Sequence, residues 1–118
     1  MKIASISGVT NYVKNISETA AFYSALGFRL GEQDEHSLTV YVNWFWIRFQ
    51  TTEDIIASDQ NRGTYLNLKV VDVDEFYAGL VDQGLTPLSQ PQDTSWNSRE
   101  FRIQDPDGYT LAFFQKMK

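Results

Sequence analysis

Most of the side chains in this sequence that could take part in chemistry are aromatic rings or single polar groups on strand-like segments. Successive side chains of a strand point to opposite faces, so the residues between the apolar ones face away from the core. Aromatic surface with a few directed polar groups is typical of a small-molecule pocket, because rings supply affinity and polar groups fix orientation. This pattern, with one loop tryptophan, predicts a ligand-binding set of Trp44, Trp46, Arg48, Tyr65, Asn67, Trp96, Glu100, Arg102, Ala112 and Phe114.

Several of these residues have a second interpretation. Trp44 and Trp46 share a face and could equally pack in a dimer interface. Arg48 could bind a ligand carboxylate, or it could form an ion pair with Glu100. Trp96 could cover a planar ligand as a lid, or it could fill its own loop as a hydrophobic plug.

The sequence gives little support for a catalytic site. Tyr65 is predicted to be a hydrogen-bonding contact, since a catalytic phenol needs a partner base and none is identifiable. The chain has no cysteine, which excludes cysteine nucleophiles and thiolate metal sites. It also lacks the G-x-S-x-G, phosphate-loop and dinucleotide glycine motifs. The single histidine, His36, lies in a polar turn and is predicted to be a solvated surface residue, so no catalytic residue is assigned.

An internal repeat organises the elements that must position these residues. Asn15-Ile16-Ser17-Glu18 aligns with Asp72-Val73-Asp74-Glu75 at a shift of 57 residues (72 − 15 = 57). Each copy predicts a strand, a helix with a capping residue, a glycine stop at Gly27 or Gly84, and further strands. The order βαβββ therefore occurs twice. Two such short modules cannot each bury a core alone, so they are expected to share a sheet.

Alternating apolar residues, capping residues and turn residues define the element bounds. The polar segment 51–63 is predicted to be a linker between module 1 (about 1–52) and module 2 (about 64–116) of one 118-residue domain. The expected strands cover residues 6–13, 28–30, 38–43, 44–50, 65–70, 101–103 and 109–115. One helix is expected to begin after Asn15, and the other to cover residues 74–83. A short extended piece is expected at 85–88 and a loop at 90–98.

Composition excludes several classes of function. A net charge of −5 and unclustered Lys and Arg residues disfavour binding to a phosphate backbone, so no nucleic-acid partner is expected. The sequence has no apolar run of about 18 residues, so no membrane span is expected. The apolar part of the N-terminal segment is too short for a signal peptide, and a cytoplasmic protein is the default expectation.

Short motifs follow the repeat in order along the whole chain. They are Tyr12-Val13-Lys14-Asn15, Phe22-Tyr23-Ser24-Ala25-Leu26-Gly27-Phe28, Val70-Val71-Asp72-Val73-Asp74, Asp93-Thr94-Ser95-Trp96, Arg99-Glu100-Phe101 and Asp105-Pro106-Asp107-Gly108. In this order they resemble the vicinal oxygen chelate superfamily, which includes glyoxalase I, extradiol dioxygenases and bleomycin-resistance proteins. The resemblance implies an α+β fold in which two βαβββ modules form a curved mixed sheet with a cleft, paired as a homodimer. A generic ferredoxin-like α+β domain is the alternative.

The resemblance also indicates which positions would bind a metal. Enzymes of this superfamily typically use a His on the first strand and a Glu on the last strand of each module. The corresponding residues here are Gly8 and Tyr65 at the His positions, and Arg48 and Ala112 at the Glu positions. Gly and Ala have no ligand atom, Arg is a fixed cation, and Tyr could bind only as phenolate. No metal and no other cofactor is therefore expected.

These observations predict a metal-independent small-molecule-binding protein of the glyoxalase/bleomycin-resistance superfamily, which sequesters a planar or aromatic compound. The alternative is a metal-dependent lyase, isomerase or dioxygenase of the same superfamily with relocated ligands. A third interpretation is an accessory domain whose cleft is vestigial. The expected partners are a small-molecule ligand and a second copy of the chain, in a swapped or unswapped homodimer.

Overall fold

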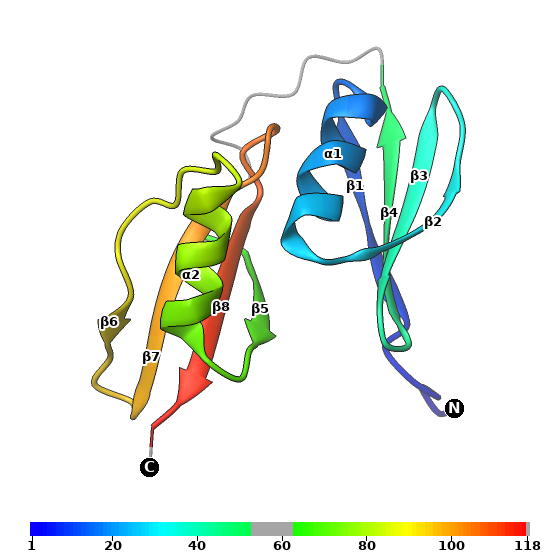
Figure 1. The fold of residues 1–118 in the computed structure, drawn as a ribbon. Helices are drawn as coiled ribbons and strands as arrows, with labels where there is room; N and C mark the ends of the chain where they lie inside the picture. Colours follow the sequence, from blue (N-terminus) through cyan, green and yellow to red (C-terminus); the bar gives the residue numbers. More distant parts are fainter. Residues whose placement is uncertain (53–62, 118) are drawn as a thin grey trace. The chain divides into compact units, whose positions relative to one another are not determined.

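The computed structural model describes residues 1–52 and 63–117 of the chain. The chain divides into two compact units, residues 1–56 and 57–118, and the boundary falls in the segment predicted to be a linker. Residues 53–62 of that segment lie outside the described residues. The elements in chain order (Figure 1) are β1 (Gly8–Val13), α1 (Ile16–Leu26), β2 (Arg29–Gln33), β3 (Ser37–Val42), β4 (Phe45–Thr51), β5 (Tyr65–Lys69), α2 (Val73–Asp82), β6 (Gln92–Asp93), β7 (Ser98–Gln104) and β8 (Thr110–Lys116).

The two modules repeat one strand topology, which confirms the α+β fold class and the βαβββ order. The strand orders are β1-β4-β3-β2 and β5-β8-β7-β6, and in each module the first strand pairs in parallel with the last. Gly8 is in register with Trp46, and Tyr65 is in register with Thr110. Among the described residues, the strands form two four-stranded sheets rather than the single shared sheet that the repeat suggested.

The first module is built on a capped helix and a core of aliphatic and aromatic side chains. The Asn15 side chain accepts a hydrogen bond from the Glu18 N–H at 2.9 Å, and Gly27 ends the helix with a φ of 103°, as the sequence predicted. Tyr23 of α1 is 1% exposed and lies against Phe49 of β4, with a ring centroid distance of 4.7 Å. This contact fixes one face of the first sheet against α1 and leaves the other face free of its own helix (Figure 1).

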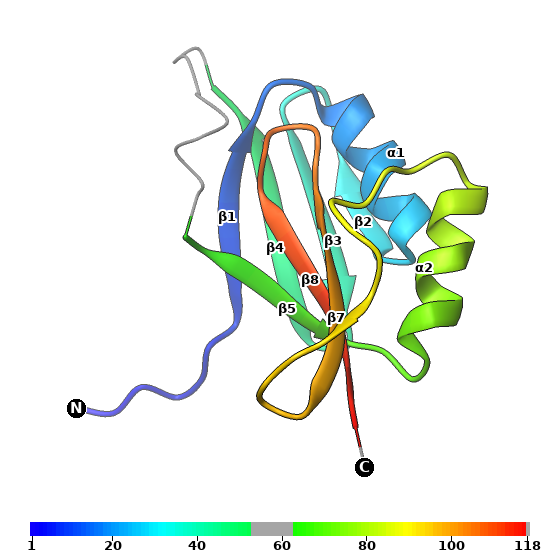
Figure 2. The ribbon, with the colours of Figure 1, turned by 90° about the vertical axis from the view of Figure 1, so that its left-hand side faces the viewer.

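The second module repeats this design with a larger aromatic cluster. The Asp72 side chain accepts from the Glu75 N–H at 3.1 Å, so α2 begins at Val73, slightly before the predicted range. Phe76 of α2 lies 4.6 Å from Phe113 of β8, measured between ring centroids. Both views show α2 beside β7 and β8 (Figure 1, Figure 2). None of the helices that the structure describes is long and apolar enough to cross a membrane.

Several predicted element bounds differ from those in the structure. The strand expected from Ile6 begins at Gly8, and the strand expected from Trp44 begins at Phe45. Asn43 has a φ of 53° and forms a tight turn with Trp44 between the paired residues Val42 and Phe45. The loop expected over 90–98 contains the two-residue strand β6, which is too short to show any periodicity. The piece at 85–88 is not a strand.

Candidate functional site

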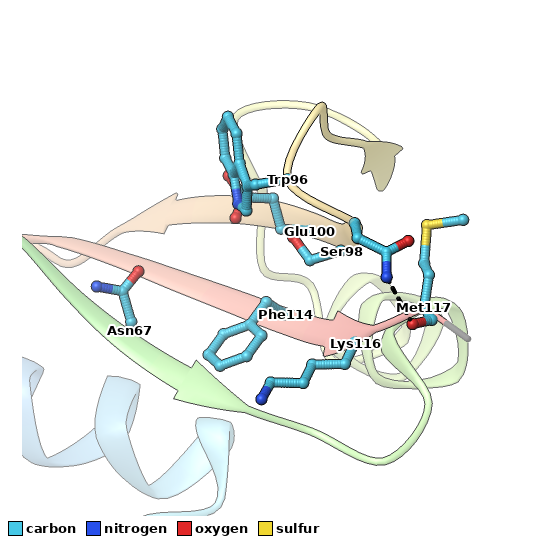
Figure 3. Close-up of a pocket in the computed structure, with 8 residues that line it drawn as sticks. Asn67, Trp96, Ser98, Glu100, Phe114, Lys116 and Met117 are labelled. Atoms are coloured by element: carbon cyan, nitrogen blue, oxygen red, sulfur yellow. Dashed lines mark hydrogen bonds between the residues drawn. The ribbon is translucent and has the colours of Figure 1, made fainter.

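A pocket of about 400 Å³ lies on the second module, where the ends of β7 and β8 meet the turn before β7. Leu111, Phe113 and Phe101 are buried, so the residues that alternate with them, such as Glu100 and Phe114, lie on the opposite face of the sheet. We call this cavity the Trp96 pocket (Figure 3). Its lining residues are Asn67, Trp96, Asn97, Ser98, Glu100, Phe114, Lys116 and Met117.

The turn that carries Trp96 is held by hydrogen bonds at both of its ends. Thr94 and Ser98 are joined by a bond from the Thr94 N–H to the Ser98 carbonyl at 2.8 Å, and their hydroxyl groups lie 2.9 Å apart. Asn97 has a φ of 64°, and its side-chain amide donates to the Met117 carbonyl at 3.1 Å (Figure 3). The Trp96 side chain projects from this turn, and the residue is 64% exposed, so most of its surface is accessible to solvent.

Arg99 ties this segment to the rest of the module. Its guanidinium donates to Asp93 of β6 at 2.9 Å and to Asp74 of α2 at 3.1 Å. The hydrogen bonds to Asp74, and then those to Asp93, raise the pKa of Arg99 above its usual value. One side chain of β7 thus fixes both β6 and the start of α2 on the outer side of the Trp96 turn.

A second polar network lies next to the Trp96 pocket. Arg102 donates to the Tyr65 hydroxyl at 2.9 Å, and its guanidinium carbon lies 4.2 Å from the Tyr65 ring centroid. Arg102 also donates to a Glu100 carboxylate oxygen at 3.3 Å, and only 15% of the Glu100 side chain is exposed. Trp96 and Glu100 also line a second cavity of about 340 Å³, whose other lining residues are Ser89, Gln92, Asp93, Thr94, Phe101 and Arg102.

The structure brings together part of the predicted ligand-binding set. Asn67, Trp96, Glu100 and Phe114 line the Trp96 pocket. Tyr65 and Arg102 form the adjacent network instead. Ala112 lies on the predicted face, in register with Asn67 and Arg102, but it is 1% exposed and offers almost no surface to a ligand.

Sequence reasoning missed four of the residues that line the pocket. Ser98 and Lys116 lie two residues from Glu100 and Phe114 along β7 and β8, so the same alternation could have found them. They were missed because the predicted strands stopped short of them. Asn97 and Met117 are brought to the pocket by the turn and the chain end, which no periodic signal marks.

The predicted residues of the first module lie on and near its sheet. Trp46 and Arg48 lie on the face opposite the buried Ile47 and Phe49, and the Arg48 guanidinium carbon is 5.5 Å from the Trp46 ring centroid. The alternative partner for Arg48, Glu100, has its ion pair with Arg102. Trp44 was predicted on a strand, but it lies in the β3–β4 turn and is 69% exposed.

The four positions that the resemblance assigns to metal ligands do not suit a metal ion. Gly8 and Ala112 have no donor atom, and Arg48 would repel a cation. The Tyr65 hydroxyl already accepts a hydrogen bond from Arg102, whose positive charge would also oppose a bound metal. Among residues 1–52 and 63–117, no group of three or more His, Asp or Glu side chains is placed to hold a metal ion. His36, 80% exposed at its side chain, contacts Thr51 and Glu35.

Solved structures with this fold cover nearly the whole chain. A glyoxalase/bleomycin resistance protein/dioxygenase from Nocardioides has a TM-score of 0.83 and 15% identity, over 100% of this chain and 87% of that one. A virulence protein from Salmonella typhimurium has a TM-score of 0.76 and 18% identity, over 99% and 100% of the two chains. A bleomycin-binding protein complexed with bleomycin has a TM-score of 0.73 and 21% identity, over 96% and 99%. At these identities the likeness shows a common fold.

Comparison at the level of sequence gives the family. A search of curated proteins finds no match. The model of the Glyoxalase/Bleomycin resistance protein/Dioxygenase superfamily matches residues 5–113, which is most of the chain. This match includes both modules and all the residues of the predicted ligand-binding set except Phe114. The chain therefore belongs to the glyoxalase/bleomycin resistance protein/dioxygenase superfamily.

Proposed function

We propose that this protein binds a small planar or aromatic molecule in the Trp96 pocket, without a metal ion, and acts by sequestering it. The observation that carries the proposal is the pairing of two aromatic side chains, Trp96 and Phe114, around a cavity of about 400 Å³. A volume of this size is within the range of roughly 300–1,000 Å³ that is typical of small-molecule sites. The pocket therefore has room for a ring system of drug-like size.

The lining combines ring surface with a few polar groups. Trp96 is largely exposed, and a planar ligand that stacks on it would remove apolar surface from water. Asn67 and Lys116 offer a donor and acceptor pair and a charged donor at the edge of the pocket, and these groups would orient the ligand. The affinity would come mainly from the rings. Because sequestration needs only binding, the proposed role requires no turnover.

The donor set supports binding without a metal ion, and one structural neighbour supports the binding of a small molecule. The positions that would hold a metal carry Gly8, Arg48, Tyr65 and Ala112, which are poor ligands for a cation. One solved structure with the same fold is named as a bleomycin-binding protein in complex with bleomycin. Binding of a small molecule is thus compatible with this fold.

Tryptophan fluorescence tests the proposal directly. The chain has three tryptophans, and a planar compound that stacks on Trp96 should quench part of their emission. Titration with a panel of planar antibiotics should identify at least one quencher that also raises the melting temperature. The variant W96F should lose most of the quenching by that compound.

The matched control is Trp44→Phe, because Trp44 is similarly exposed but lies in the turn of the first module. W44F should keep the quenching and the thermal shift. Equal losses in W96F and W44F would contradict a site at Trp96. One bound transition metal per purified chain, found by elemental analysis, would favour the alternative of a metal-dependent lyase, isomerase or dioxygenase.

We also propose that the protein is a homodimer, with exchanged or unexchanged modules. The basis is the superfamily to which the chain belongs and the division of the chain into two units, whose described residues form a four-stranded sheet with one helix in each unit. Light scattering during gel filtration should give a mass near 27.2 kDa (2 × 13.6 kDa). A mass of 13.6 kDa at micromolar concentration would contradict it.

A further inference from the structure

The first module has a surface of its own that the proposed function does not use. On the sheet face opposite α1, Arg29, Tyr41, Trp46 and Gly8 lie in one row across β2, β3, β4 and β1. Arg48 lies in the next row, between Thr39 and Thr10. We call Arg29, Tyr41, Trp46 and Arg48 the arginine–aromatic face.

Two glycines shape this face. An added Cβ atom at Gly8 would overlap the Trp46 ring, and one at Gly31 would lie 2.6 Å from the Tyr41 ring. The two rings therefore occupy the space that side chains at Gly8 and Gly31 would fill, and each ring lies across a neighbouring strand. We call the rings of Tyr41 and Trp46, which lie along the sheet rather than perpendicular to it, the aromatic floor of this face.

Each ring of the floor is paired with an arginine. The Arg29 guanidinium carbon lies 4.5 Å from the Tyr41 ring centroid, and that of Arg48 lies 5.5 Å from the Trp46 ring centroid. A guanidinium that stacks on a ring keeps its N–H donors in its own plane, where they can reach a carboxylate in a bidentate geometry. Both arginines are exposed.

The charge of this face is unusual for the chain. The protein carries a net charge of −5, yet among the four strands of this sheet the only acidic residue is Glu32 of β2. In the second module, Arg99 and Arg102 have carboxylate partners at 2.9–3.3 Å. In contrast, Arg29 and Arg48 have no carboxylate partner among the described residues of the first module. Their charges are thus available to an anion.

We propose that the arginine–aromatic face binds planar anions, specifically aromatic carboxylates. The ring of the ligand would lie on the aromatic floor, and its carboxylate would accept hydrogen bonds from Arg48 or Arg29. The inference does not depend on the Trp96 pocket, because every residue that carries it belongs to the first module.

Calorimetric titration with 1-naphthoate and with its neutral analogue 1-naphthamide tests the charge requirement. A charge-assisted bidentate contact should make naphthoate bind at least about tenfold more tightly than naphthamide. Arg48→Gln and Arg29→Gln should each weaken naphthoate binding, with the double variant at least about tenfold weaker than the wild type. The variants should keep their circular dichroism spectra, since both arginines are exposed.

Two control variants distinguish binding at this face from a general charge effect and from binding in the Trp96 pocket. Lys69→Gln changes the net charge by the same amount at an exposed position of the second module, and it should leave naphthoate binding unchanged. Phe114→Ala alters the Trp96 pocket, so a loss of naphthoate binding in F114A that R48Q does not share would place naphthoate in that pocket instead. The inference is overturned if naphthoate fails to bind at millimolar concentration, if naphthamide binds equally well, or if F114A abolishes binding while R48Q does not.

Discussion

At the scale of single residues, the space beside Gly8 determines how Trp46 lies on the first sheet. Gly8 and Trp46 are register partners on the parallel strands β1 and β4. Their side chains would normally stand side by side on one face, but the missing Cβ atom lets the indole ring lie over β1. The absence of a side chain at Gly8 thus allows the Trp46 ring to lie along the sheet rather than perpendicular to it.

The variant Gly8→Ala should therefore destabilise the protein by about 1–3 kcal/mol, the usual cost of overpacking. Its methyl group would overlap both the Trp46 ring and the Trp46 carbonyl oxygen, and the carbonyl cannot move without distorting β4. The measurement is the free energy of unfolding from urea titration. The control is Gly79→Ala on α2, where nothing lies within 4 Å of the added Cβ atom.

Gly79→Ala should stabilise the protein by about 0.5–1 kcal/mol, because alanine loses less conformational entropy in a helix than glycine. If both variants changed stability in the same direction, the steric explanation for Gly8 would be wrong.

Asp34 makes the stability of the β2–β3 turn depend on pH. Backbone N–H groups of His36 and Ser37 donate to its carboxylate at 2.8 and 2.9 Å, and the bond from His36 is the main cause of its lowered pKa. A lowered pKa in the folded state means that the carboxylate stabilises the fold above the unfolded value of about 3.9. That contribution is lost as the pH falls through the lower folded value.

Between pH 7 and pH 3, the urea midpoint of the wild type should therefore fall further than that of Asp34→Asn, whose amide does not titrate. Asp82→Asn is the control, because Asp82 of α2 accepts no side-chain hydrogen bond from the described residues. Its urea midpoint should follow that of the wild type across the same pH range. If the urea midpoints of the wild type and of D34N fell equally between pH 7 and pH 3, the role given to Asp34 would be wrong.

At the scale of elements, the Trp96 turn depends on ion pairs that lie outside the pocket. Arg99 of β7 joins Asp93 of β6 to Asp74 of α2, while β6 itself pairs with β7 over only two residues. A two-residue strand contributes few ladder hydrogen bonds, so these side-chain contacts are a large part of what holds the segment before Trp96.

Arg99→Gln should loosen this segment more than it destabilises the whole protein. Exposed ion pairs usually contribute no more than about 1 kcal/mol, so the free energy of unfolding should change little. Amide hydrogen exchange of residues 92–97 should accelerate, whereas exchange in β4 and α1 should stay unchanged. Lys69→Gln is the control for the loss of one positive charge. Unchanged exchange at 92–97 in R99Q would show that β6 is held by its backbone pairing alone.

The element boundaries show what the sequence could and could not predict. The helices α1 and α2 were predicted, because Asn15 and Asp72 cap their first turns and a glycine in the left-handed region, Gly27 or Gly84, follows each helix. The turn at Asn43 and Trp44 was missed, because its positive φ falls on asparagine inside an aromatic run that itself resembles a strand. The register between strands, which sets the neighbours of Ala112 and Arg102, depends on long-range pairing and cannot be read from one segment.

At the scale of the whole molecule, the repeat places equivalent positions of the two modules in equivalent register. Gly8 and Tyr65 differ by 57 residues, and their partners Trp46 and Thr110 differ by 64 (110 − 46 = 64). The additional residues of the second module (64 − 57 = 7) thus fall between the first and last strands of the module, the interval that also contains the Trp96 turn. The two modules therefore differ. The second has the longer segment and the Trp96 pocket, whereas the first has the arginine–aromatic face.

The residue types at these equivalent positions can be tested with metal ions on the whole protein. A metal that bound only the folded state with a Kd of 1 μM would, at 100 μM, stabilise it by about 2.7 kcal/mol, which corresponds to several degrees in Tm. Because the four equivalent positions hold Gly8, Tyr65, Arg48 and Ala112, we expect Ni²⁺, Zn²⁺, Mn²⁺ and Fe²⁺ each to change Tm by less than about 1 °C at that concentration. Treatment with a chelator should likewise leave Tm unchanged. A rise of several degrees with one of these ions, lost again with the chelator, would show that carboxylates elsewhere in the chain form a metal site.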